Sequence, residues 1–297
     1  MKRFFAILLS TIVAIVSLTG CIQENASVTI NADGSATVNA IIKIEKEYYE
    51  SQYSSNEFNI AEEIKQESPN ATINEYEETI KGETYKCFDI SESFSSIAKA
   101  KKSVFDGTLF ESGTMSKTKF VANYGTYSND FTKDSLSISK SDMEAMQNLI
   151  KITFSVTFPQ KIVYTNGKLS KDKKTATWNL VKLPNAASIC AYTNKKEIKA
   201  GPVKELKATK MEEEANIQWA KTYKASGYQI KLGTNKKLTS GKKTVNVKKN
   251  ASKAKIKGLK SDKNYYVKIR SYIKIGSKKY YGKWSKVTAV YKTVIKN

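Results

Sequence analysis

Alternation of apolar and polar residues is the clearest pattern at the start of the folded region. Residues 27–44, SVTINADGSATVNAIIKI, alternate on both sides of Asp33-Gly34. A period of two is typical of a strand with one buried face, and Asp-Gly between two such runs favours a tight hairpin turn. The sequence therefore predicts that an antiparallel hairpin opens the first domain.

Helical spacing of apolar residues interrupts this strand pattern. It is found in residues 57–67, 96–105 and 141–150, the last opened by a capping box at Ser141. Further strands are predicted at 84–94, 117–124, 151–159, 161–167, 175–180 and 188–193. Helices inserted between antiparallel strands predict an α+β domain over residues 26–198.

The last third of the chain shows only short strand patterns, with turn residues every 8 to 12 positions. The predicted strands are 203–210, 215–221, 227–233, 243–249, 252–259, 265–273 and 286–293. Seven short strands in a segment of this length are typical of a β-sandwich. We therefore expect a second, all-β domain over residues 202–297.

Charge divides the chain at the same place. The formal net charge is +22, yet residues 1–200 hold 24 Lys and Arg against 23 Asp and Glu, whereas residues 201–297 hold 26 against 5. This shift in composition at Lys199-Ala200-Gly201-Pro202 is the strongest domain boundary in the sequence. Almost all of the excess positive charge therefore belongs to the predicted sandwich.

The N-terminus has the pattern of an export signal. A basic head precedes the apolar run Phe4–Leu18, and 15 residues of helix reach only about 22 Å, too short to span a membrane comfortably. Leu18-Thr19-Gly20-Cys21 resembles the lipobox of bacterial lipoproteins. The resemblance implies cleavage after Gly20, a signal peptide over residues 1–20 and a lipid on Cys21 that holds the protein at the extracytoplasmic face of the membrane. The alternative is an ordinary secretory signal with a coincidental cysteine.

Several residues of the first domain resemble the LppM-type domain of secreted bacterial lipoproteins. They are Phe158-Pro159, Val163, Asn166-Gly167, Trp178 and Ala191, together with the early Asp33-Gly34 hairpin. The resemblance covers residues 26–195, after a tether at 21–25, and brings no catalytic residues with it. Some members are thought to bind lipids. The alternative is that these residues only shape turns and fill the core.

The second domain resembles a fibronectin type III domain of the kind found in surface proteins of Gram-positive bacteria. Trp219 falls at the core position of the second strand, Leu259 and Tyr265 resemble a tyrosine corner, and Trp284-Ser285 matches the start of the last strand. No Arg-Gly-Asp tripeptide is present. The resemblance therefore gives no support to integrin-type adhesion.

Cations alternate with apolar residues in this domain and are candidates for binding a polyanion. The candidate residues are Lys253, Lys255, Lys257, Lys268 and Arg270. A period of two places the cations of a strand on its solvent face, where Arg270 is also expected to lie over Trp284. For an exported protein the expected partners are anionic wall polymers of the teichoic type or lipid headgroups, and not nucleic acid. The alternative is a lysine-rich background composition without function.

The residue types needed for most catalytic sites are missing. The chain has no histidine, no Gly-rich phosphate loop and no Cys-x-x-Cys. We therefore expect no enzyme activity, no cofactor and no metal site. Cys87 and Cys190 remain in predicted strands of an oxidising compartment, either as a disulfide or as two buried free thiols.

These observations together predict a membrane-anchored, non-catalytic protein that binds or scaffolds at the cell envelope through its basic domain. The runner-up hypothesis is that the first domain binds a lipid or a small apolar ligand, with the sandwich as a spacer. The sequence leaves the oligomeric state open.

Overall fold

The computed structural model describes residues 23–53, 59–105, 110–124, 151–184 and 187–292. The chain forms two compact units, Met1–Glu197 and Ile198–Asn297. Gly20, Cys21 and the predicted helix 141–150 lie outside the described residues. No helix in the described part of the chain is long and apolar enough to cross a membrane.

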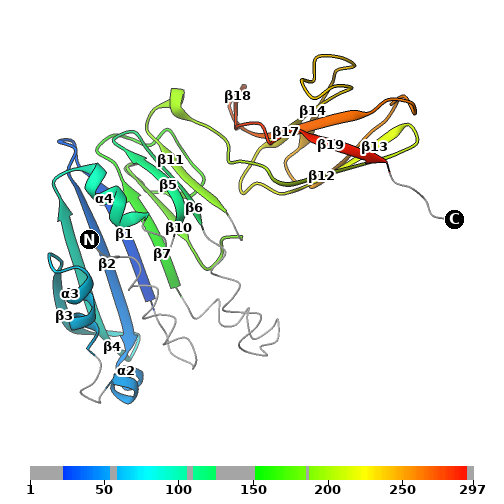
Figure 1. Cartoon of the computed structure of the whole chain (residues 1–297). Coiled ribbons are helices and arrows are strands. Elements are labelled where there is room, and N and C mark those ends of the chain that lie inside the picture. The colour runs from blue at the N-terminus through cyan, green and yellow to red at the C-terminus, as the bar shows by residue number, and fades with distance from the viewer. Residues whose placement is uncertain (1–22, 54–58, 106–109, 125–150, 185–186, 293–297) are drawn as a thin grey trace. The chain divides into compact units, whose positions relative to one another are not determined.

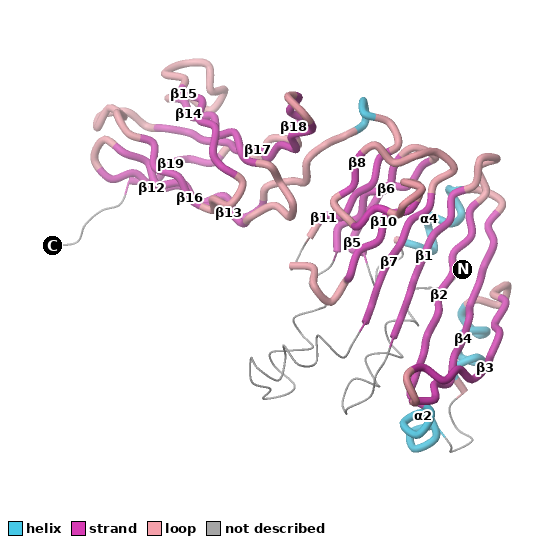
Figure 2. Tube along the Cα trace, turned by 180° about the vertical axis from the view of Figure 1, so that it is seen from behind, coloured by secondary structure: helices cyan, strands magenta, loops and turns pink. Residues whose placement is uncertain are grey.

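The first unit is built on a seven-stranded sheet with the order β3-β4-β2-β1-β7-β10-β9 (Figures 1 and 2). Its strands are β1 Gln23–Ile30, β2 Ala36–Glu45, β3 Thr72–Ile80, β4 Glu83–Phe94, β7 Lys151–Thr157, β9 Lys168–Leu169 and β10 Thr175–Asn179. β1 pairs with β7 in parallel, while its other neighbour β2 is antiparallel. The sheet is therefore mixed, and the prediction of a purely antiparallel sheet is wrong at this pair.

The predicted hairpin at Asp33-Gly34 is confirmed. The side chain of Asp33 accepts hydrogen bonds from the backbone and the hydroxyl of Ser35, at 2.9 and 2.7 Å. Gly34 has a φ of +97°, which an L side chain rarely adopts. The hairpin then pairs β1 with β2 in a register that buries every second residue of both strands.

A second sheet of four strands, in the order β5-β6-β11-β8, packs against the first. Its strands are β5 Phe110–Ser116, β6 Lys119–Tyr124, β8 Tyr164–Thr165 and β11 Ser188–Tyr192. The contact between the sheets is aromatic, because Phe120 lies 5.2 Å from the Phe154 ring and 6.3 Å from the Trp178 ring. Phe110 adds an edge-on contact with Phe154 at 5.0 Å. Packed aromatic rings therefore fill the space between the sheets here.

The described part of the first unit also contains three short α-helices. They are α2 Lys46–Tyr53, α3 Ile60–Glu67 and α4 Ile97–Val104. Of these, α2 and α4 contact β2 and β4 of the large sheet. Asn59 and Ser96 cap α3 and α4 by accepting backbone hydrogen bonds. α4 contacts β2, β4 and β5 and buries Ala100 and Val104. The helices near 57–67 and 96–105 are confirmed, but strands make up most of the described first unit.

The second unit is a β-sandwich. Its strands are β12 Lys204–Met211, β13 Glu214–Ala220, β14 Gly227–Gly233, β15 Lys243–Lys248, β16 Lys253–Ile256, β17 Tyr265–Ile275, β18 Lys278–Tyr281 and β19 Thr288–Lys292. One layer contains β12, β13 and β16, and the other contains β15, β14, β17 and β19, with β18 on β17. A short parallel pairing of β12 with β19 joins the layers at one edge.

The core between the two layers contains Trp219, Tyr228 and Ile269. The tyrosine-corner contact is present, because the hydroxyl of Tyr265 accepts a hydrogen bond from the backbone N–H of Lys260 at 3.0 Å. The sandwich begins earlier than residue 202: Ile198 and Ala200 are buried, and Ser271 donates a hydrogen bond to the carbonyl of Gly201. The boundary lies between Glu197 and Ile198.

Candidate anion-binding surface

The candidate cations of β16 lie on the outer face of the three-stranded layer. Lys253 and Lys255 are exposed, whereas Ile256 at the end of the strand points into the core, and Lys257 is exposed just after the strand ends. Lys255 forms an ion pair with Glu214 at 3.0 Å. The predicted solvent-facing alternation is therefore confirmed, but one of the three lysines is already paired with a carboxylate.

Lys268 and Arg270 belong to β17 in the other layer. Ile269 between them is fully buried in the same core, so both cations face outward from the opposite side of the sandwich. Two layers that share a core present their outer faces in opposite directions. The structure therefore does not bring the five candidate cations together: those of β17 and those of β16 lie on different outer faces of the sandwich.

Arg270 is held by two aromatic rings. Its guanidinium carbon lies 3.7 Å from the centre of the Tyr281 ring and 4.4 Å from the centre of the Trp284 ring. Two of its N–H groups donate to the side-chain oxygen of Gln229, at 3.0 and 2.7 Å. Partial burial among these groups lowers the pKa of Arg270 from its usual value. The predicted contact with Trp284 is confirmed.

This contact is part of a longer row of cations and aromatic rings. Lys268 lies 5.0 Å from the Trp284 ring, and Lys279 lies 4.6 Å from the Tyr272 ring, which in turn meets Tyr281 edge-on at 5.8 Å. We call these residues the cation–aromatic ladder: Lys268, Trp284, Arg270, Tyr281, Tyr272 and Lys279. Lys231 of β14 approaches the same tryptophan ring at 5.6 Å.

Tyr281, Tyr272 and Lys279 of this ladder, and also Lys231, are not predicted from the sequence. The usable signal was the alternation of outward residues in β17, where Lys268, Arg270 and Tyr272 follow one another at a period of two. The residues of β18 and β14 gave no such signal, because only the strand pairing places them beside β17.

Carboxylates are absent from the strands around the ladder. The five acidic residues of the sandwich are Glu205, Glu212, Glu213, Glu214 and Asp262. All of them belong to β12, β13, the turn between them or the loop before β17, so β14, β15, β17, β18 and β19 contain none. The positive charge of the ladder face is therefore not neutralised within its own sheet.

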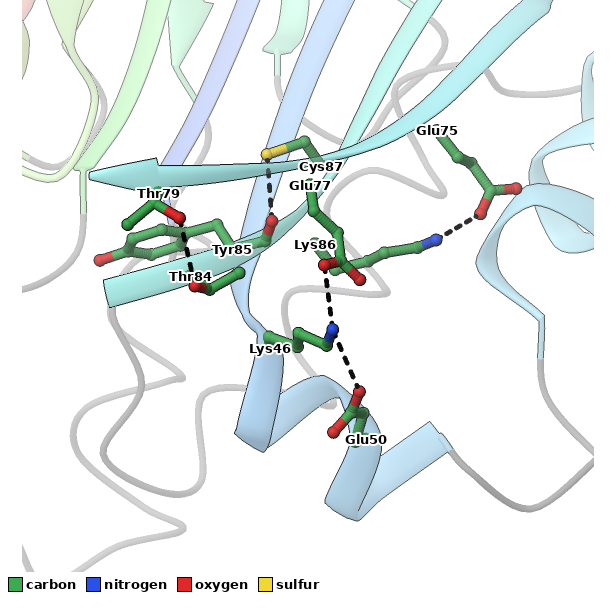
Figure 3. Close-up of polar contacts among 9 residues, drawn as sticks. All are labelled: Lys46, Glu50, Glu75, Glu77, Thr79, Thr84, Tyr85, Lys86 and Cys87. Atoms are coloured by element: carbon green, nitrogen blue, oxygen red, sulfur yellow. Dashed lines mark hydrogen bonds and ion pairs between the residues drawn. The ribbon is translucent and has the colours of Figure 1, made fainter. Parts of the chain in front are cut away.

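The first unit provides a contrast, because its cations are paired across the edge of the large sheet. Figure 3 shows Lys46 of α2 bonded to Glu77 of β3 at 2.9 Å, and Lys86 of β4 bonded to Glu75 at 3.1 Å. Lys43 is paired with Glu78 beside them. Exposed pairs of this kind contribute little stability, about 0 to 1 kcal/mol each, but they neutralise the surface.

The motif residues of the first unit have structural roles. The side-chain oxygen of Asn166 accepts hydrogen bonds from the indole of Trp178 at 2.9 Å and from the backbone N–H of Cys190 at 2.8 Å. Its amide donates to the carbonyl of Ser188 at 2.7 Å. A Cβ on Gly167 would stand 2.7 Å from the Trp178 ring. These residues therefore fix the end of β10 against β11.

Cys87 and Cys190 are buried free thiols in different sheets, so the disulfide alternative is wrong. Burial raises the pKa of Cys190 to about 12 and also raises the pKa of Cys87. Thiols that stay protonated at neutral pH are poor nucleophiles and metal ligands. Among the described residues, no group of three or more His, Cys, Asp or Glu side chains is placed to hold a metal ion.

Comparison with known proteins gives a family match for the first unit: residues 23–189 match the LppM domain family. No curated protein matches the chain. Among solved structures, the folded domain of the Mycobacterium tuberculosis LppM protein is 15% identical, with 61% of this chain and 96% of that chain covered and a TM-score of 0.35.

Two further solved structures are similar over about a third of the chain. The FN5 domain of Drosophila Lar is 19% identical, with 31% of this chain and 97% of that chain covered and a TM-score of 0.25. A Fn3-like protein from Clostridium thermocellum is 15% identical, with 33% and 98% covered and a TM-score of 0.28.

Proposed function

Because the chain belongs to the LppM domain family, we propose that it is a non-catalytic, lipid-anchored envelope protein whose second unit binds an anionic envelope polymer. The match covers more than half of the chain and suggests an extracytoplasmic protein of the lipoprotein type. The buried, protonated thiols and the structural role of Asn166 support a non-catalytic first unit. The second unit supplies the binding surface.

The observation that carries this proposal is the separation of charge between the two units. Residues 201–297 hold 26 Lys and Arg against 5 Asp and Glu, while the preceding 200 residues are close to neutral. A surface with such an excess of cations attracts linear polyanions and raises their association rate. Wall polymers and lipid headgroups are the polyanions available outside a bacterial membrane, and the proposal commits to the polymer.

The lipid anchor is a separate part of the proposal and rests on Leu18-Thr19-Gly20-Cys21. Two acyl chains on Cys21 would hold the protein stably, since each buried CH₂ contributes about 0.8 kcal/mol and one chain alone binds only marginally. The two signals fit together: the lipid would fix the protein at the membrane, and the cations would engage polymer close to it.

The runner-up hypothesis of an apolar ligand in the first unit has less support. Such a ligand needs a hollow between the two sheets. The rings of Phe110, Phe120, Phe154 and Trp178 instead pack against one another with centroids 5.0 to 6.3 Å apart. This packing favours a solid core in that part of the unit.

The test is retention of the chain from residue 22 onward on purified cell wall. Retention is expected at low salt, about 20 mM. The protein is expected to elute as the salt concentration rises, because its binding to a polyanion releases counterions. Wall stripped of its anionic polymer serves as the control. Equal retention on stripped wall, or no retention at low salt, would contradict the proposed function.

A further inference from the structure

Two lysines of β17 each lie directly opposite a lysine of a neighbouring strand. Lys231 of β14 is the direct cross-strand partner of Lys268, and Lys279 of β18 is the direct partner of Lys274. Like charges directly opposite one another in a sheet are destabilising. Since none of the adjoining strands contains a carboxylate, the sheet retains this repulsion. A bound anion would relieve it.

The outward cations of β17 have a regular spacing. Lys268 and Arg270 are two residues apart, and Lys274 follows four residues later with Tyr272 at the outward position between. Two residues of a strand advance about 6.7 Å. Two peptide residues contain six backbone bonds, and so does one glycerol phosphate repeat of a phosphodiester polymer. The phosphates of such a polymer, when extended, therefore recur at about the spacing of these cations.

The aromatic rings hold the cations in place before any ligand binds. Arg270 is fixed between Tyr281 and Trp284, and it bonds to Gln229 through only two of its N–H groups. A guanidinium has five N–H donors. Those not used by Gln229 have no other hydrogen-bond partner among the described residues. A guanidinium fixed in this way loses little entropy on binding a phosphate, and its planar fork fits phosphate oxygens.

We propose that the cation–aromatic ladder, together with Lys231 and Lys274, is the binding site for a linear polyol-phosphate polymer. This inference rests on the proposed function and names its site and its ligand class. The row of cations from Lys268 to Lys274 extends over about 20 Å of strand. That length suits several successive phosphates of one extended chain better than a single lipid headgroup.

The experiment compares two variants of equal charge, in the chain from residue 22 onward. The ladder variant is Lys231→Gln, Lys268→Gln and Lys279→Gln. The control variant is Lys204→Gln, Lys207→Gln and Lys253→Gln, which removes three exposed cations of β12 and β16, the strands of the other layer. The probes are poly(glycerol phosphate), poly-glutamate and vesicles of phosphatidylglycerol, and thermal unfolding verifies that each variant is folded.

The inference predicts that the ladder variant binds poly(glycerol phosphate) at least tenfold more weakly than the wild type, and the control variant less than threefold more weakly. It also predicts that poly-glutamate binds the wild type more weakly than poly(glycerol phosphate). Replacing Lys231, Lys268 and Lys279 by arginine keeps the charge and is expected to keep the affinity, which separates lost binding from lost folding.

Three results would overturn the inference, and they are distinguishable. If the wild type binds neither polymer nor wall at low salt, the proposed function fails as well. If both variants lose affinity equally, binding depends on total charge and only the assignment of the site fails. If the wild type binds phosphatidylglycerol vesicles as tightly as the polymer, with the same loss in the ladder variant, the ligand is a membrane surface.

Discussion

Asn166 illustrates how one buried side chain connects two sheets of the first unit. Its replacement by alanine is expected to leave the indole N–H of Trp178 and two backbone groups of β11 without their partners. A hydrogen bond contributes about 1 kcal/mol net, and an unpaired buried group costs about 1 to 3 kcal/mol. We therefore expect Asn166→Ala to lower the free energy of unfolding by about 3 kcal/mol in urea titrations.

The control for this prediction is Asn70→Ala, at an exposed turn before β3. A surface substitution of this kind changes stability by less than about 0.5 kcal/mol. Equal stability of the two variants would contradict the role assigned to Asn166.

Glu24 is a second buried residue with a testable consequence. It lies on the core-facing side of β1 with Ala26, its exposed fraction is 2%, and its Oε2 atom has no hydrogen-bond partner among the described residues. Burial raises the pKa of this carboxyl from 4.5 to about 8. The folded state therefore keeps a proton between pH 4.5 and 8 that the unfolded state loses.

The sign of the pH dependence follows from that proton. The contribution of Glu24 to the free energy of unfolding is largest below pH 4.5 and falls as the pH rises towards 8. The reason is that, between these pH values, the folded state binds more protons than the unfolded state. Each pKa unit corresponds to 1.36 kcal/mol, so from pH 5 to pH 8 the loss is on the order of 4 kcal/mol. Glu24→Gln is expected to remove this loss in urea titrations, whereas Glu83→Gln at the exposed start of β4 is not. The same slope in Glu24→Gln and wild type would contradict the assignment.

At the scale of elements, the pairing of β14 with β17 couples stability to binding. Lys231→Glu would place a carboxylate directly opposite Lys268 and replace a repulsion by an ion pair. Cross-strand pairs of opposite charge contribute about 0.2 to 1 kcal/mol. We expect this variant to be more stable than the wild type at low salt, to lose that gain at 1 M salt, and to bind poly(glycerol phosphate) more weakly.

The matched control is Lys248→Glu on β15, whose cross-strand partner is Gly227. It makes the same change in charge without facing a cation, so no gain in stability is expected. Urea unfolding and polymer titration measure both quantities. A gain in stability equal for the two variants, or an unchanged affinity in Lys231→Glu, would contradict the account of the ladder face.

Strands and helices with a strong local signal could be predicted from the sequence. The turn at Asp33-Gly34 is stabilised by local contacts of Asp33 itself and is therefore predictable from these two residues. The seven predicted strands of the sandwich are all present. β3 was missed because it is an edge strand whose polar residues are mostly exposed, and its position depends on pairing with β4. α2 was missed because its residues have no clear apolar stripe. Such elements depend on tertiary contacts that no local pattern encodes.

The candidate site could be predicted only in part, for a related reason. A period of two shows which residues of a strand share a face, and this correctly placed Lys255 and Arg270 in the outward sets. The period cannot tell which layer a strand joins. Lys231 and Tyr281 therefore remained unnoticed until the strand pairing brought them beside β17.

At the scale of the whole molecule, anchoring is assigned to Cys21 and polymer binding to the second unit. Cys21→Ser removes the thiol that would carry the acyl chains, so fatty-acid labelling and cleavage after Gly20 are expected to be lost. Salt-sensitive retention on purified wall is expected to persist, because the cations of the second unit are unchanged. Fatty-acid labelling of Cys21→Ser equal to that of the wild type would contradict a lipid anchor at this residue.

The most direct test of the central claim maps the lysines that the polymer covers. Lysines of the chain from residue 22 onward would be acylated with and without poly(glycerol phosphate), and their modification rates compared by mass spectrometry. Strong protection is expected for Lys231, Lys268 and Lys279, and little protection for Lys207 and Lys253 on the opposite face. Equal protection of the two groups, or protection confined to the β16 face, would contradict the central claim.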